Sequence, residues 1–310
     1  MITILRSTDV GLERAENLAD GCWVNLVAPG ADEVAQLHEE YDIPHDFITS
    51  ALDLDERART ERDENALLIV LRVPHFQGET SDIPYVTVPL GIVLTSRVIV
   101  TVCKIETSII SDLASGRMRG LSTTKRNRFV LHLLLAAAGK YLLYVREINR
   151  MVDILEDRLQ ASLRNREVLE LLKYQKSLTF FTTALKSNEL MIGRLQKSRL
   201  FTMYPEDEDL LEDVLTEFGQ AMEMTTISSG ILSQMMDAFA SIISNNLNVV
   251  MKFLASVTII LALPTLVASI FGMNIPLPFE DHPAALLIIL GGTAAITVAI
   301  VFVFIRKDWL

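Results

Sequence analysis

The sequence predicts an α/β domain at the N-terminus, a stalk of long α-helices, and two transmembrane helices at the C-terminus. Residues 1–105 contain apolar runs rich in β-branched residues, which are typical of strands, between stretches that favour helices. Residues 124–200 contain no proline, and their apolar residues recur at intervals of three and four, as in long helices. Near the C-terminus, 253–271 and 284–305 contain no charged residue and have the length of a membrane span.

The N-terminal part is expected to combine three strands with two helices. Strands are predicted at Leu67–Leu71, Val86–Leu94 and Val98–Val102, where β-branched residues are frequent. Helices are predicted at Ala31–Tyr41 and Pro44–Arg59, because both segments carry an acidic residue in the first turn, where the helix dipole favours negative charge. This mixture predicts the α/β class for the first part of the chain.

Long helices are expected to follow this domain. Residues 124–204 predict a pair of amphipathic helices with a break near Asn165. A third helix is predicted to begin after Pro205, in an acidic run that suits a helix N-terminus, and to continue to Phe271. Its roughly 64 residues would extend about 96 Å at 1.5 Å per residue. The stalk and the first membrane span are therefore expected to form one continuous helix.

The two apolar runs predict a transmembrane hairpin. The loop between them contains Glu280 and Asp281 but no Lys or Arg, whereas Lys252 precedes the first span and Arg306 and Lys307 follow the second. By the positive-inside rule, both termini lie in the cytoplasm and the loop lies outside. The first residues lack the apolar core of a signal peptide, so the N-terminal part is expected to stay in the cytosol. The expected segments are the cytosolic α/β domain (1–123), long cytosolic helices (124–204), stalk helix (205–248), transmembrane helix 1 (249–271), outer loop (272–283), transmembrane helix 2 (284–305) and cytosolic tail (306–310).

Composition argues against several classes of function. The 310-residue chain has a formal net charge of −11, which disfavours nucleic acid as a partner. Its two cysteines, Cys22 and Cys103, lie in apolar strand-like segments, where buried thiols are expected rather than a disulfide or a metal site. The sequence has no Ser-His-Asp grouping and no phosphate-binding glycine loop. An enzyme is therefore not expected, and a membrane-anchored scaffold stays open as an alternative.

A stripe of small and polar residues follows one face of the third helix. Steps of three and four residues connect its members, and the flanking faces are apolar. A polar stripe that enters the hydrocarbon region is costly against lipid, so it must face protein or water. Several assembled copies would enclose it around a water-filled pore, whereas close packing of helices is the alternative for its small residues. The stripe comprises Gln234, Asp237, Ser241, Ser244, Asn248, Met251, Ala255, Thr258, Ala262, Thr265 and Ser269.

The stripe ends just before Phe271-Gly272-Met273-Asn274, which precedes the outer loop. A Gly-Met-Asn tripeptide at the end of the first of two C-terminal spans resembles the CorA family of magnesium and cobalt channels, the two-transmembrane Gly-Met-Asn superfamily. The resemblance covers the whole chain and includes the tail Arg306–Leu310. It implies a CorA-like funnel, built as a homopentamer in the cell inner or plasma membrane, which imports hydrated Mg²⁺ and accepts Co²⁺ or Ni²⁺ as surrogates.

The resemblance also implies a selectivity filter and a pore lining. Gly272, Met273 and Asn274 would form the filter, in which the amide oxygens of Asn274 bind the metal ion without removing its waters. Glu280 and Asp281 in the outer loop would attract cations electrostatically. The implied pore-lining residues are Asn248, Met251, Leu254, Ala255, Thr258, Ala262, Thr265 and Ser269.

Gating is expected at two levels. Asp213 and Asp237 would bind regulatory Mg²⁺ between subunits and stabilise a closed state, so that loss of Mg²⁺ lets the subunits move apart. Met251 and Leu254 would form an apolar collar that blocks ions by dewetting. The acidic cluster Asp207, Asp209 and Glu212 is also expected to bring like charges near one another once subunits assemble.

Two departures from the family pattern bear on these roles. Phe271 stands where the family often has Tyr, and Ala262 replaces a bulkier methionine, which loosens the expected gate. A zinc transporter of the same superfamily is retained as the alternative function. Zinc prefers softer ligands such as Cys and His, and the stripe contains neither. The stripe therefore slightly favours Mg²⁺ over Zn²⁺ as the transported ion.

Overall fold

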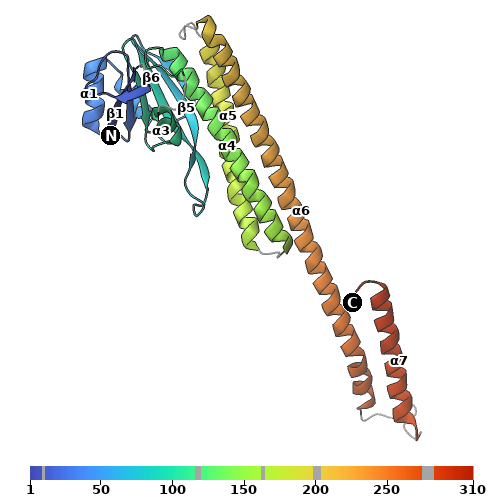
Figure 1. The fold of residues 1–310 in the computed structure, drawn as a ribbon. Coiled ribbons are helices and arrows are strands. Elements are labelled where there is room, and N and C mark those ends of the chain that lie inside the picture. Colours follow the sequence, from blue (N-terminus) through green and yellow to red (C-terminus); the bar gives the residue numbers. More distant parts are fainter. Residues whose placement is uncertain (9–10, 116–119, 162–164, 198–203, 274–282, 310) are drawn as a thin grey trace. The chain divides into compact units, whose positions relative to one another are not determined.

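The computed structural model describes residues 1–8, 11–115, 120–161, 165–197, 204–273 and 283–309. The chain divides into two compact units, Met1–Gln234 (unit one) and Met235–Leu310 (unit two), and each has its own architecture. The boundary falls within one helix, α6 (Pro205–Phe271), so residues of α6 belong to both units (Figure 1).

A seven-stranded mixed sheet forms the centre of unit one, in the order β2-β1-β3-β7-β6-β5-β4. Neighbouring strands are antiparallel except β3 and β7, which run parallel. The two longest strands, β5 and β6, pair over their full length, from Ala66 opposite Thr95 to Phe76 opposite Tyr85. The strands are β1 (Ile2–Thr8), β2 (Gly11–Arg14), β3 (Cys22–Val27), β4 (Arg59–Arg62), β5 (Ala66–Phe76), β6 (Tyr85–Thr95) and β7 (Ile99–Cys103).

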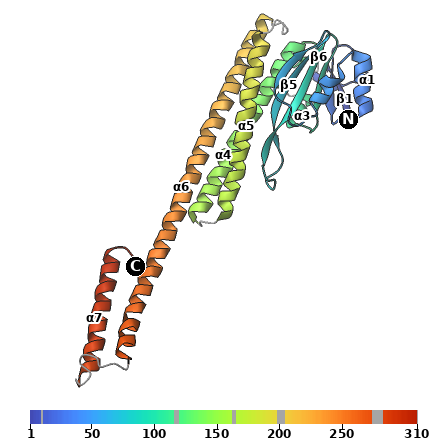
Figure 2. The ribbon, with the colours of Figure 1, turned by 180° about the vertical axis from the view of Figure 1, so that it is seen from behind.

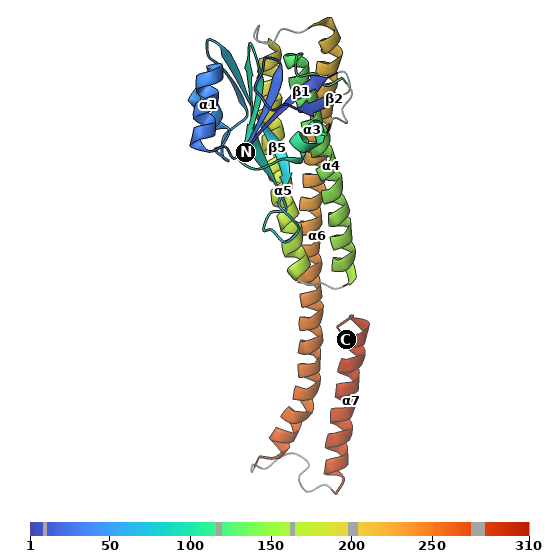
Figure 3. The same cartoon turned by 60° about the vertical axis from the view of Figure 1, so that its left-hand side comes forward.

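Helices cover both faces of this sheet (Figures 2 and 3). Two successive residues of β3 show the two faces of the sheet. Val24 belongs to a buried apolar cluster that includes Leu37 of α1 and Phe47 of α2. Trp23 points to the other face and packs edge-on against Phe129 of α4. Both layers are closed to water, because all five of these side chains are almost fully buried. The helices of unit one, besides the first part of α6, are α1 (Ala31–Tyr41), α2 (His45–Ser50), α3 (Ser108–Ala114), α4 (Arg126–Ala161) and α5 (Asn165–Lys197).

Most elements agree with the sequence-based predictions. The helix Ala31–Tyr41 is confirmed, and the first two predicted strands are confirmed as parts of β5 and β6. The third, predicted at Val98–Val102, is β7, which begins and ends one residue later. The pair of long helices with a break near Asn165 corresponds to α4 and α5, and α6 continues to Phe271 as predicted. The second apolar run forms α7 (Ala285–Arg306).

The prediction of one helix over Pro44–Arg59 is wrong beyond Ser50, where α2 ends. The following segment forms turns, in which the backbone N–H of Asp55 donates to the Asp53 carboxylate at 3.1 Å. Such a local side-chain bond competes with the hydrogen bonds of a helix. The sequence also does not predict β1, β2, β4 and α3, which are short and rich in polar residues. β3 begins at Cys22, in a segment that the sequence marks as strand-like.

Gly91 in β6 marks a close approach between the sheet and the end of α2. A Cβ atom at this position would lie 2.5 Å from the Cβ of Ala51. That distance is far below van der Waals contact, and Ala51 is fully buried, so neither group has room to move aside. A side chain at position 91 would therefore force the sheet and α2 apart.

Gly91→Ala is expected to destabilise unit one by about 1–3 kcal/mol through overpacking. The midpoint of thermal unfolding of the detergent-solubilised full chain measures this effect. Gly139→Ala is the matched control, because Gly139 is an exposed position of α4 with no neighbouring atom within 4 Å of an added Cβ. The control is expected to stabilise by about 0.5–1 kcal/mol, and equal midpoints for the two variants would contradict the close approach.

Three of the described helices have the length and composition to cross a membrane: α4, α6 and α7. The most apolar window of α4 is 61% buried within the structure, compared with 6% for that of α6 and 0% for that of α7. Apolar surface left uncovered on this scale marks contact with lipid or other chains. α4 is therefore a core helix of unit one, while α6 and α7 are the candidate spans and lie side by side in unit two (Figures 1 and 3).

Candidate functional site

The stripe predicted to line a pore lies on the uncovered side of α6. The eight implied pore-lining residues, which are seven members of the stripe and the neighbouring Leu254, are all exposed in the single chain, whereas Ser256 is fully buried. Successive residues of an α-helix are rotated by about 100°, so Leu254 and Thr258 lie roughly opposite Ser256. The exposed residues are Asn248, Met251, Leu254, Ala255, Thr258, Ala262, Thr265 and Ser269.

The covered side of α6 follows the same spacing as the stripe. Val257, Ile260, Leu263 and Val267 are half-buried in unit two and share the side of Ser256. In this unit α7 is the neighbouring helix, and its own half-buried residues recur every three or four positions. The hairpin therefore leaves the polar stripe free on the side of α6 that faces away from α7.

The hydroxyl groups of the stripe are bonded within their own helix. Thr258 Oγ1 donates to the Leu254 carbonyl at 2.7 Å, and Thr265 Oγ1 donates to the Leu261 carbonyl at 2.9 Å. Ser269 Oγ donates to the Thr265 carbonyl at 2.8 Å. Each hydroxyl has one hydrogen and two acceptor lone pairs, and its hydrogen is already used by these bonds. The stripe therefore presents oxygen lone pairs, which accept hydrogen bonds, to whatever occupies the space beside it.

The stripe is also hollowed. Its small residues form a shallow groove along the membrane part of α6, between larger apolar neighbours. Below this groove, Met251 and Leu254 are both exposed by 58% and bring large apolar side chains to the same face. The face thus changes from a groove that carries hydroxyl groups to a section of large apolar side chains within about two turns. The residues that line the groove are Thr258, Ile259, Leu261, Ala262, Leu263, Thr265, Leu266 and Ser269.

The helix ends where the tripeptide begins. The backbone N–H of Gly272 donates to the Ala268 carbonyl at 3.0 Å, and that of Met273 donates to the Ile270 carbonyl at 3.3 Å. An added Cβ at Gly272 would lie 3.3 Å from the Ala268 carbonyl oxygen, so glycine fits this last turn best. Met273 is exposed. The other predicted residues of this end, Asn274, Glu280 and Asp281, lie outside the described residues.

The predicted regulatory carboxylates, Asp213 and Asp237, are both exposed on α6. Asp213 belongs to unit one and Asp237 to unit two. Within the described part of one chain, no group of three or more His, Cys, Asp or Glu side chains is placed to hold a metal ion.

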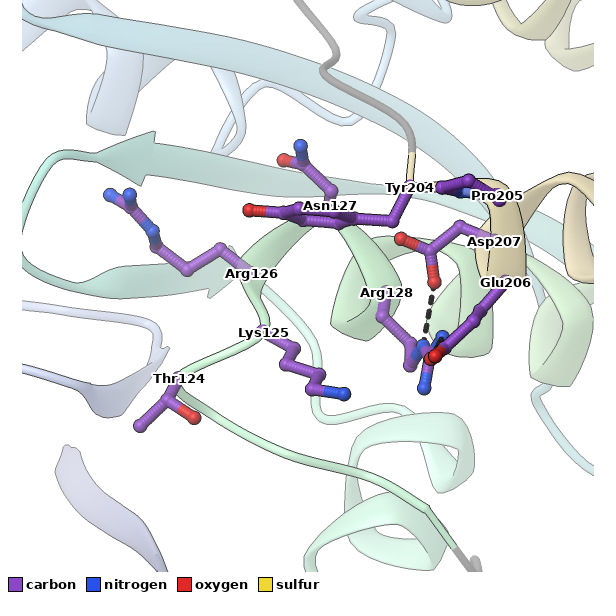
Figure 4. Close-up of a pocket in the computed structure, with 9 residues that line it drawn as sticks. All are labelled: Thr124, Lys125, Arg126, Asn127, Arg128, Tyr204, Pro205, Glu206 and Asp207. Carbon is purple, nitrogen blue, oxygen red and sulfur yellow. Dashed lines mark hydrogen bonds and ion pairs between the residues drawn. The ribbon is translucent and has the colours of Figure 1, made fainter.

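Asp207 does not add a free charge to the acidic cluster that the sequence predicts with Asp209 and Glu212. It is 2% exposed, and its carboxylate accepts a hydrogen bond from Arg128 Nε at 2.6 Å (Figure 4). Glu206 accepts a second bond from Arg128 at 3.0 Å. These two carboxylates raise the pKa of Arg128 above its usual value. Asp207 is thus an internal ion-pair partner, whereas Asp209 and Glu212 are exposed.

Comparison with known proteins places these features in a family. A family model described as "CorA-like Mg2+ transporter protein" matches residues 19–306. The chain belongs to this family. The cobalt/magnesium transport protein CorA of Methanocaldococcus jannaschii is 27% identical over 299 residues, which cover 93% of this chain and 91% of that protein. The protein of the same name from Thermotoga maritima is 25% identical over 309 residues, which cover 93% and 83%.

A solved CorA structure shares the full-length fold. The complete structure of the CorA magnesium transporter from Methanocaldococcus jannaschii matches with a TM-score of 0.87 at 22% identity, covering 100% of this chain and 99% of that one. The CorA resemblance and the predicted fold class, an α/β domain with long helices and C-terminal apolar helices, are therefore confirmed. Membership of a transporter family agrees with the expectation that the chain is not an enzyme.

Sequence reasoning about this CorA-like chain misses two features of the site. Arg128 lies 79 positions from Asp207, and nothing local in the sequence joins them. Ser256 is one serine among several near the first span, yet it alone is buried between Ala240 and Phe271, a stretch that the structure describes completely. A helical projection of the sequence would have placed Ser256 opposite the stripe, which is the signal that was available.

Proposed function

We propose that this CorA-like chain forms a homopentameric channel that imports hydrated Mg²⁺, and Co²⁺ as a surrogate, into the cytosol. The observation that carries the proposal is the stripe on α6. It is exposed, polar and opposite the side that faces α7, in a segment whose length and composition suit a membrane span. A polar face in that position needs water or protein beside it. Several copies of the chain, arranged with their stripes towards a common axis, would supply neighbouring protein and would enclose water.

The hydroxyl geometry supports passage of the hydrated ion. Mg²⁺ holds its waters tightly, and these waters point their hydrogens outward. A wall that accepts hydrogen bonds therefore suits the hydrated ion better than a wall that donates them. Thr258, Thr265 and Ser269 offer acceptor lone pairs because their hydrogens are bonded to α6 itself. Neutral acceptors bind weakly enough to release the ion, as conduction requires.

The filter and the collar complete the proposed pore. We assign the filter to Gly272, Met273 and Asn274, with the Asn274 amide oxygens as the first group to meet the hydrated ion. Met251 and Leu254 form the apolar collar, which their exposure on the stripe side of α6 supports. The channel is assigned to the cell inner or plasma membrane. By the positive-inside rule, the filter lies on the outer side of this membrane and both termini lie in the cytoplasm.

Uptake of metal ions into liposomes tests the proposal. The purified full chain is reconstituted, and Mg²⁺ and Zn²⁺ entry are each followed with an ion-specific dye. We expect Mg²⁺ entry, and Asn274→Ala is expected to lower it several-fold because the ring of amide oxygens is lost. Zn²⁺ entry without Mg²⁺ entry would favour a zinc transporter of the same superfamily. No entry of either ion would leave the scaffold as the better hypothesis.

Regulation by cytosolic Mg²⁺ is proposed to act through Asp213 and Asp237. Both are exposed, and among the described residues of one chain neither belongs to a group of three or more His, Cys, Asp or Glu side chains that could hold a metal ion, which suits a site shared between subunits. Asp213→Lys with Asp237→Lys is expected to raise several-fold the internal Mg²⁺ concentration that half-inhibits uptake. The reason is that bound Mg²⁺ no longer favours the closed state.

The matched control for this prediction is a charge reversal elsewhere on the same helix. Glu223 is exposed on α6 between the two aspartates. Each of two single variants, Glu223→Lys and Asp237→Lys, reverses one charge on α6. Glu223→Lys is expected to leave the half-inhibiting Mg²⁺ concentration at the value of the parent protein, whereas Asp237→Lys is expected to raise it. Unchanged inhibition in the double aspartate variant would refute the assignment of the sensor.

A further inference from the structure

The C-terminal tail forms a defined turn at the end of α7. The backbone N–H of Trp309 donates to the Phe304 carbonyl at 3.0 Å, and that of Asp308 donates to the Ile305 carbonyl at 3.3 Å. Asp308 has a left-handed backbone conformation, with a φ angle of 56°. These bonds and this conformation define a Schellman motif, in which Lys307 is the C-cap and Asp308 is the residue after it.

The aromatic pair strengthens this assignment. A Schellman motif is frequently accompanied by an apolar contact between the second residue after the cap and the third residue before it. Here those residues are Trp309 and Phe304, whose rings stack with centroids 5.5 Å apart and planes inclined by 15°. The tail is therefore held by backbone bonds and by ring packing together.

The turn meets α6 at Ser256. Ser256 Oγ lies 2.8 Å from the Lys252 carbonyl and 3.4 Å from the Trp309 carbonyl, so its one hydrogen is shared between its own helix and the tail. Ser256 is also the fully buried residue in a stretch of α6 that is otherwise exposed or half-buried. Ser256 is thus the position in this stretch of α6 that is covered most completely, and the carbonyl of the tail residue Trp309 lies beside it.

We propose that the turn Lys307–Trp309 is a clasp that fastens the C-terminal end of α7 to α6 at Ser256. The clasp fixes which side of α6 faces α7, and thereby holds the opposite side, with Leu254 and Thr258, towards the pore. Ser256 and Asp308 are then positioning residues for conduction. This role in conduction rests on the proposed function, whereas the clasp itself does not.

A pair of substitutions at Asp308 tests the clasp. Glycine adopts the left-handed conformation freely, and a β-branched residue resists it. Asp308→Gly is therefore expected to keep or tighten the turn, and Asp308→Val to open it, with equilibria that differ by about tenfold or more. Ser256→Leu is a second way to open the clasp, because a fully buried position has no room for the larger side chain.

Tryptophan fluorescence of the full chain in liposomes reports the state of the clasp. The chain has two tryptophans, and Trp23 is fully buried in unit one, so a change in quenching by acrylamide comes from Trp309. Asp308→Val and Ser256→Leu are expected to raise the quenching constant about twofold as the turn opens, and Asp308→Gly is not. Equal quenching in Asp308→Val and Asp308→Gly would overturn the clasp.

Mg²⁺ uptake by the same liposomes tests the positioning role. Asp308→Val and Ser256→Leu are expected to lower uptake several-fold, and Asp308→Gly is expected to keep it. An opened clasp with undiminished uptake would overturn the positioning role. A parent protein without uptake would overturn the proposed function and the positioning role together, while the quenching comparison would still decide whether the clasp exists.

Discussion

Replacing the three stripe hydroxyls with apolar groups is expected to lower Mg²⁺ uptake by at least about tenfold, since each lost hydrogen bond is worth about 0.5–1.5 kcal/mol and 1.4 kcal/mol corresponds to tenfold in rate. The variant combines Thr258→Val, Thr265→Val and Ser269→Ala. These changes nearly preserve side-chain shape but remove the acceptor oxygens that face away from α7. Liposome uptake with a Mg²⁺ dye measures the effect.

The triple variant is expected to fold, because the hydroxyls that it lacks donate their hydrogen bonds to carbonyls of α6 itself. Threonine and serine bonded in this way contribute little to a helix and slightly favour bending. Loss of uptake would then report lost ion contacts rather than a lost assembly. Size-exclusion chromatography in detergent checks that the variant elutes with the parent protein.

The second membrane helix supplies a matched control. Thr293 and Thr297 of α7 also donate to carbonyls of their own helix, at 2.7 and 2.8 Å, but they are half-buried and do not belong to the stripe. Thr293→Val with Thr297→Val is therefore expected to keep uptake near that of the parent. Equal losses in the two helices would contradict the assignment of the stripe to the pore and would indicate a general requirement for hydroxyls in the hairpin.

The parts of the structure that the sequence predicts best are those set by local periodicity. Helix Ala31–Tyr41 and the continuous α6 follow from the spacing of apolar residues and from the acidic residues near their starts. The stripe is likewise a property of one helix, and its residues are exposed in the single chain. Its orientation towards a pore depends on other copies of the chain and stays a prediction.

The features that the sequence does not predict depend on contacts between distant segments. An acidic run at a helix start is usually solvated, and only the position of Arg128 on α4 turns Asp207 into a buried ion-pair partner. The left-handed turn in the tail is similarly hard to predict, because the residue that adopts this conformation is Asp308 and not a glycine. In both cases the local pattern suits a commoner arrangement, and tertiary contacts decide otherwise.

Arg128→Met is expected to lower the unfolding midpoint of unit one by about 6 °C or more, as removal of one partner of a buried ion pair leaves the other charge uncompensated. Asp207 is the partner left behind, with a side chain that is 3% exposed. This pair joins the first turn of α6 to the first turn of α4, so its loss also frees the start of α6 (Figure 4). Thermal unfolding of the detergent-solubilised full chain, followed by circular dichroism, measures the midpoint.

A double variant separates the cost of the unpaired charge from the loss of packing. Arg128→Met with Asp207→Leu replaces the pair with apolar groups and is expected to recover most of the lost midpoint, since no charge is then buried alone. Arg97→Met is the surface control: Arg97 pairs with Asp20 at 2.7 Å, but both side chains are more than half exposed. Its midpoint is expected to change by no more than about 3 °C. If Arg128→Met changed the midpoint as little as Arg97→Met, Asp207 would have to be solvated, and it would return to the acidic cluster available for cations.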